Sequence, residues 1–126
     1  MLTLDFAEAK LRHTTWKLRL RRFLDGEEVL TEAQAIDHHA CEVGRWLAAP
    51  GSGGFARWGQ RSELSELDAA HRAMHAAVRR VIEARNAGRM ADAERAFDEA
   101  DGHARAVVTL LTSIEGFVAA GGKSAA

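Results

Sequence analysis

The stretch MADAERAFDEADGHARAVVTLLTSIEGFVA, residues 90–119, carries the most regular hydrophobic pattern in the chain. Its apolar residues recur at alternating steps of three and four, which places them on one face of an α-helix. They are Met90, Ala93, Phe97, Ala100, Ala104, Val107, Leu111, Ile114 and Val118. The stretch therefore predicts one long packed helix, and we expect the final residues, 121–126, to form a disordered tail.

The same spacing predicts a first helix over about residues 4–25. Its apolar face is made of Phe6, Ala9, His13, Trp16, Leu20 and Phe23. Three leucines one heptad apart are expected to widen this face: Leu4, Leu11 and Leu18. Asp25 and Gly26 form a C-terminal stop signal, because glycine readily adopts the left-handed conformation that ends a helix.

A second helix is predicted from Thr31 to Ala48, with Thr31 as N-cap and Gln34 completing a capping box. Its expected apolar face consists of Val29, Ala33, Ile36, Ala40, Val43 and Leu47. The only proline and three glycines follow in residues 50–54, which predicts a loop with a short turn or helix around residues 55–59.

A third helix is expected from about Ser62 to residues 86–88. Its apolar face consists of Leu64, Leu67, His71, Met74, Val78 and Val81. Four helices with short connections favour an all-α fold, an antiparallel four-helix bundle with a short extra turn or helix between the second and third helices. We expect one domain over residues 1–120.

Composition narrows the functional classes. The 126 residues include 17 basic and 18 acidic side chains, so net charge predicts no nucleic-acid partner. A single cysteine cannot form an intramolecular disulfide, and the N-terminus lacks the apolar run of a signal peptide. No stretch approaches the ~18 to 20 apolar residues of a membrane span. These features favour a cytoplasmic protein without membrane insertion.

Two histidines, His13 and His71, occupy positions on the predicted apolar faces. A buried histidine without a polar partner costs roughly 1 to 3 kcal/mol, so each needs a hydrogen bond or a metal ion. His75 follows His71 by four residues and lies on the same helix face, where two imidazoles can bind one ion. Together with Cys41 these residues form a candidate zinc site, and His38 competes with His13 for the fourth position.

The blocks around these residues resemble a known family. His13-Thr-Thr-Trp16, Cys41-Glu-Val-Gly-Arg-Trp46 and the His71/His75 pair are similar to the chemoreceptor zinc-binding domain family of bacteria. The resemblance spans about residues 13–83, with Val43 in place of the usual leucine. It implies one zinc ion per chain held by three histidines and one cysteine, and it selects His13 over His38.

The resemblance also implies a role and partners. Members of the family are typically attached to soluble chemoreceptors or diguanylate cyclases and pair as homodimers, so we expect a homodimer and a signalling partner of one of these types. No cyclase signature occurs in the chain. Four protein ligands saturate tetrahedral zinc, so we expect a sensor and not an enzyme. Either zinc availability or oxidation of Cys41 is expected to be the signal.

Several neighbours of the predicted ligands are candidates for supporting roles. Trp16 and Trp46 are expected to shield the site or to pack as ordinary core residues. Gly44 is expected to allow a close approach of helices over the metal. Asp37 and Asp68 are either carboxylate partners of the imidazole N–H groups or simply solvated.

Two other functions compete with the zinc hypothesis. The first helix carries a basic face that could bind nucleic acid or an anionic surface; it consists of Lys10, Arg12, Lys17, Arg19, Arg21 and Arg22. The chain could also be a structural dimerisation bundle. A di-iron centre is disfavoured, because an acidic residue three positions before a candidate ligand histidine occurs only at Asp68.

Overall fold

The computed structural model describes residues 3–35 and 41–124, with side chains up to residue 120. Three long helices dominate it: α1 (Phe6–Leu24), α4 (Ser62–Asn86) and α5 (Met90–Ser124). The shorter elements are the 3₁₀-helix η1 (Glu32–Gln34), α2 (Glu42–Ala48) and α3 (Gly54–Trp58). The described residues contain no β-strand, which confirms the all-α prediction.

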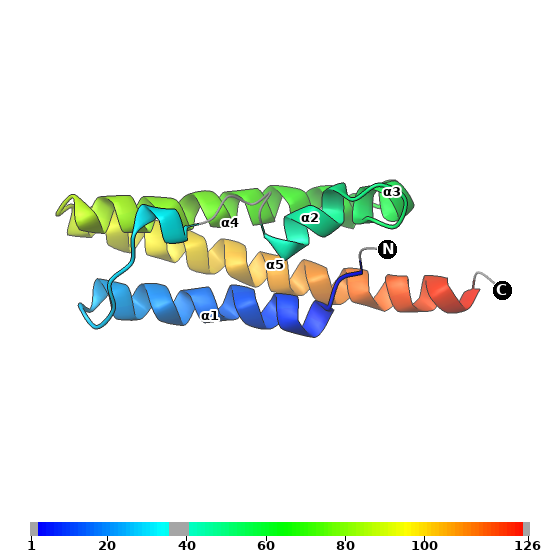
Figure 1. Ribbon diagram of the computed structural model, residues 1–126, viewed down its shortest axis with the longest axis horizontal. Helices are drawn as coiled ribbons and strands as arrows, with labels where there is room; N and C mark the ends of the chain where they lie inside the picture. The colour runs from blue at the N-terminus through cyan, green and yellow to red at the C-terminus, as the bar shows by residue number, and fades with distance from the viewer. Residues whose placement is uncertain (1–2, 36–40, 125–126) are drawn as a thin grey trace.

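The three long helices lie alongside one another (Figure 1). Helices α4 and α5 form an antiparallel hairpin, and α1 packs along α5 on the other side. Helices α2 and α3 flank the N-terminal half of α4. Short elements thus occupy the place of the expected second helix. In the part of the chain that the structure describes, no helix has the length and apolarity needed to cross a membrane.

The ends of the long helices follow the signals in the sequence. The Asp5 carboxylate caps α1 by accepting a hydrogen bond from the Glu8 amide (3.0 Å). Helices α1 and α4 both end in a glycine with positive φ, Gly26 at 82° and Gly88 at 80°. Each glycine is followed by an amide that bonds back five residues, as in a Schellman motif. The stop at Gly88 allows the tight turn between α4 and α5.

The expected continuous helix from Thr31 to Ala48 is wrong. The capping box forms, since the Thr31 amide donates to Gln34 Oε1 (2.8 Å), but it starts only the short η1. Ala35 leaves the helical conformation at φ −84° and ψ 75°. Its carbonyl accepts a hydrogen bond from Arg79 of α4 (3.0 Å), and this tertiary bond takes the place of one that a continuing helix would make.

The predicted apolar face of that second segment is also partly wrong. Val29 is 83% exposed and Ala33 is exposed, whereas Leu30 and Ala35 are buried. Val43 and Leu47 of α2 are buried as expected. Ile36 and Ala40 lie outside the described residues.

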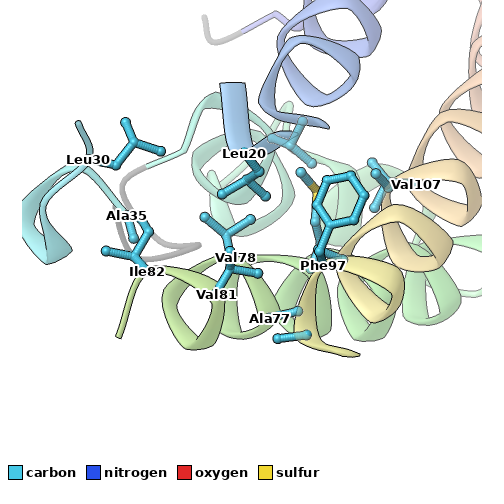
Figure 2. Close-up of a cluster of buried hydrophobic side chains, with 14 of the residues drawn as sticks. Leu20, Leu30, Ala35, Ala77, Val78, Val81, Ile82, Phe97 and Val107 are labelled. Carbon is cyan, nitrogen blue, oxygen red and sulfur yellow. The ribbon is translucent and has the colours of Figure 1, made fainter. Parts of the chain in front are cut away.

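The core lies between α1, α4 and α5 (Figure 2). Leu20 of α1 points toward Val78 and Val81 of α4, with Phe97 and Val107 of α5 beside them. The predicted face of α4 is buried throughout: Leu64, Leu67, His71, Met74, Val78 and Val81.

Three details of the long helices need correction. Met90 at the start of α5 is 39% exposed. Leu11 and Leu18 point away from the core and are 65% and 63% exposed, so they do not widen the buried face of α1. Helix α5 continues to Ser124, beyond the expected end near Ala119 and into the segment expected to be disordered.

Candidate metal centre

His13 lies on the buried face of α1 and is 3% exposed. Its Nδ1 is 2.7 Å from the carbonyl oxygen of Ala9, one turn earlier in the helix. Because a carbonyl oxygen only accepts hydrogen bonds, Nδ1 must carry the proton and donate it. The lone pair is therefore on Nε2, which faces the interior. Such an anchored tautomer is typical of histidines that bind metal ions.

His71 and His75 come from successive turns of α4. They are 0% and 9% exposed, and their ring centroids are 4.5 Å apart. The two Nε2 atoms are 3.1 Å from each other, so both rings direct the same nitrogen at one point. The four-residue spacing predicted this convergence, because such residues share a helix face.

Cys41 occupies the N-cap position of α2 in an extended conformation, at φ −73° and ψ 145°. Its Sγ lies 3.7 Å from His13 Nε2. The side chain is only partly buried, unlike the three histidines. The start of α2 therefore brings the sulfur to the histidines of α1 and α4.

The donor atoms of His13, Cys41, His71 and His75 all lie within 4.8 Å of one another. Zinc binds at 2.0–2.1 Å from nitrogen and about 2.3 Å from sulfur, so a tetrahedral site needs nitrogens about 3.3 Å apart and sulfur about 3.6 Å from nitrogen. The separations of 3.1 and 3.7 Å match these values. The donor types and these two separations fit tetrahedral zinc.

Burial favours the uncharged forms of the ligands. It lowers the pKa of His13, and hydrogen bonding to the Ala9 carbonyl opposes the effect only in part. Burial raises the pKa of the Cys41 thiol, while the amides of Val43 and Gly44 act in the opposite direction. A neutral imidazole is ready to bind a metal ion, whereas the thiol needs the charge of the ion to lose its proton.

The structure separates the predicted supporting residues. Trp16 is partly buried and packs against the core. Trp46 is 4% exposed and its ring lies edge-on to Phe6, with a centroid distance of 5.8 Å. Gly44 is buried in α2. The shielding and close-approach roles of these residues stay predictions.

The two predicted carboxylate partners are not both described. Asp68 forms an ion pair with Arg72 (3.1 Å), so its carboxylate has a partner on the surface of α4. A further bond from Asp68 to an imidazole stays a prediction. Asp37 and the rival ligand His38 lie outside the described residues.

Sequence reasoning missed two parts of the centre. The Ala9 carbonyl that orients His13 is a backbone group, and only its position four residues before the histidine could have pointed to it. The extended conformation of Cys41 was hidden by the helical pattern on both sides of it. Both are consequences of local backbone geometry that residue types do not specify.

A buried group of three imidazoles and one sulfur, held by an all-helical scaffold, defines a metal-binding domain. The profile of the chemoreceptor zinc-binding domain family matches residues 13–82, more than half of the chain and a span that includes all four ligands. The chain belongs to this family, and it is a zinc-binding domain. No curated protein and no solved structure gave a significant match.

Proposed function

We propose that the protein is a sensory or regulatory domain that binds one zinc ion per chain and passes its metal or redox state to a partner. The observation that carries this proposal is the convergence of the four donors in a largely buried site. Four protein ligands leave no open position for an activated water, so the site is unsuited to hydrolysis.

The origin of the ligands supports a sensing role. His13 comes from α1, Cys41 from the start of α2, and His71 and His75 from α4. Zinc therefore links three helices, and losing it frees the start of α2 from α1 and α4. A change in occupancy is thereby converted into a change in packing, which a partner could detect.

Cys41 provides the second mode of sensing. A zinc-bound thiolate reacts with oxidants, and its conversion to sulfenic acid weakens the bond to zinc. Cys41 is partly exposed, whereas the three histidines are buried, so dissolved molecules reach the sulfur more readily than the imidazoles. Oxidation would then have the same structural result as zinc loss.

Metal analysis of the purified protein tests this proposal. We expect one zinc per chain, lost or strongly weakened in Cys41→Ser and in His13→Ala. His38→Ala serves as the control, and it should keep its zinc. If His13→Ala keeps its zinc and His38→Ala loses it, the first ligand is His38.

A homodimer and a chemoreceptor or diguanylate cyclase partner in the cytoplasm complete the proposal. The exposed Leu18 of α1 supports self-association, because this large apolar side chain has no cover within the chain. Cross-linking in cells that express candidate partners would test the signalling connection.

The basic face of α1 gives less support to nucleic-acid binding. Three of its side chains pair with acidic residues of α5: Lys10 with Glu115 (3.0 Å), Lys17 with Asp101 (3.1 Å), and Arg21 with Glu94. These pairs neutralise the charge that would meet phosphates. Binding to DNA or RNA at low salt, steeply lost as salt rises, would restore this alternative.

A further inference from the structure

A pocket of about 390 Å³ lies between α1 and the start of α2 and reaches the metal centre. Three of the four ligands line it, namely His13, Cys41 and His75. His71 does not line it and is 0% exposed. The pocket therefore opens on the side of the centre where the sulfur lies.

The walls of this pocket are mainly apolar. Ala9, Trp16 and Val43 form part of the lining, and Leu11 contributes while remaining 65% exposed. The volume is within the ~300 to 1,000 Å³ range of small-molecule sites. Leu11 thus combines contact with the pocket and contact with solvent, as expected of a residue at its mouth.

Charged side chains of α1 and α2 contact one another along the walls. Arg12 of α1 bonds to Glu8 (2.9 Å) and reaches Glu42 of α2 (3.9 Å), which connects the two sides of the pocket. Arg19 lies over the ring of Trp16, with its Cζ 4.9 Å from the centroid. One of these contacts, from Arg12 to Glu42, thus spans the two sides of the pocket.

We infer that this pocket is the entrance to the metal centre and that the side chain at position 11 limits the size of the molecules that reach the Cys41 sulfur. The inference rests on the proposed function and names the class of molecule involved. Oxidants and electrophiles of a few heavy atoms, such as hydrogen peroxide, pass the entrance readily, and bulky reagents pass it slowly.

The reaction of peroxide at this site balances without another reactant. The Cys41 thiolate attacks one peroxide oxygen, an S–O bond forms and the O–O bond breaks. The oxygen that is attacked keeps its proton, so the sulfur loses two electrons and becomes sulfenic acid. The other peroxide oxygen leaves as hydroxide. The sulfur then binds zinc less strongly.

Labelling with two reagents that share one reacting group tests the entrance. Because Cys41 is the only cysteine, all thiol labelling reports on it. Iodoacetamide is the small reagent, and its fluorescein derivative is the bulky one. Labelling rates are measured on chelator-treated and zinc-loaded protein. The denatured chain gives the ratio of the two rates when no structure restricts access to the sulfur.

Position 11 has a matched control on the same helix. Thr14 is exposed, lies on α1 beside the lining residue Thr15 and does not itself line the pocket. We expect Leu11→Trp to slow labelling by the bulky reagent about tenfold. This corresponds to a higher activation free energy for the reaction of that reagent with Cys41. Leu11→Ala should speed labelling by the bulky reagent, and Thr14→Trp should leave it unchanged. Thr15→Trp, at a second lining position, should act like Leu11→Trp.

The inference that this pocket is the entrance would be overturned if labelling by the bulky reagent is unchanged in both Leu11→Trp and Thr15→Trp while circular dichroism shows normal helicity. It would also be overturned if the ratio of the two labelling rates is the same in the native and the denatured chain. The proposed function fails separately, if the purified protein holds no zinc. In that case, a labelling rate that depends on reagent size in the chelator-treated protein would still support the pocket as the entrance to Cys41.

Discussion

The Sγ of Cys41 lies 3.7 Å from Nε2 of His13, across 28 positions of sequence. One atom belongs to the N-cap of α2 and the other to the middle of α1. A zinc ion bound to both atoms would link these helices directly. Zn–N and Zn–S bonds at a tetrahedral angle place nitrogen and sulfur about 3.6 Å apart, close to this separation. Metal binding and the packing of α2 are therefore expected to be coupled.

Zinc should stabilise the folded chain. At a free zinc concentration 1,000 times the dissociation constant, we expect the free energy of unfolding to rise by about 4 kcal/mol. Urea titrations with and without a chelator measure this difference. Cys41→Ser should lose most of it, whereas a surface change such as Arg105→Gln should keep it. Equal stability of the zinc-loaded and chelated wild type would contradict the coupling.

The tautomer of His13 provides a direct spectroscopic prediction. Since Nδ1 donates to the Ala9 carbonyl at 2.7 Å, ¹⁵N NMR of the zinc-loaded protein should show Nδ1 protonated and Nε2 bound to metal. His103, which lies outside the cluster, is the internal reference, and its ring-nitrogen signals should not respond to zinc. Protonation of Nε2 in the zinc form would exclude His13 as a ligand through that atom.

Metal-free protein should lose stability in acid. Burial lowers the pKa of His13 below its ordinary value of 6.5, so between the two values the unfolded chain binds a proton that the folded chain does not. The free energy of unfolding therefore falls as pH decreases through and below 6.5. Chemical denaturation from pH 8 to pH 5 measures the slope, and His13→Phe should reduce it. A slope unaffected by this substitution would assign the effect to other groups.

Gly54 packs where a larger residue does not fit. A Cβ at this position would lie 2.9 Å from Trp46 Cζ3, 3.0 Å from Leu64 and 3.1 Å from Leu47. Gly54→Ala should therefore destabilise the fold by about 1 to 3 kcal/mol through overpacking. Gly102→Ala is the matched control: no neighbouring atom lies within 4 Å, and stability should rise by up to about 1 kcal/mol. Thermal unfolding that ranks the two variants in the reverse order would refute this packing.

Self-association should depend on the exposed face of α1. If Leu18 contacts a second copy, Leu18→Glu should shift sedimentation velocity from dimer toward monomer. The dimer dissociation constant should rise about tenfold or more, because a buried leucine contributes ~1.5 to 3 kcal/mol. Val29→Glu, at an 83% exposed position outside the helices, should leave the dimer intact. A dimer that tolerates Leu18→Glu uses another surface.

Sequence alone was sufficient for the long helices and for naming the four residues as candidate ligands. The alternating spacing of apolar residues predicted the buried faces of α1, α4 and α5, because a packed helix must bury one continuous stripe. His13 and His71 were noticeable for the same reason, since each interrupts such a stripe with a polar group. The spacing of His71 and His75 then followed from helix geometry alone.

The tertiary structure decided everything that depends on contacts between segments. The apolar spacing from Val29 to Leu47 predicts a helix, but the bond from Arg79 to the Ala35 carbonyl competes with its continuation. The extended backbone of Cys41 and the outward direction of Leu11 and Leu18 are likewise invisible in spacing. Local periodicity specifies which face of a helix is apolar, and caps in the sequence end the long helices. Packing decides where the segment after Thr31 leaves the helical conformation and which donors meet at one point.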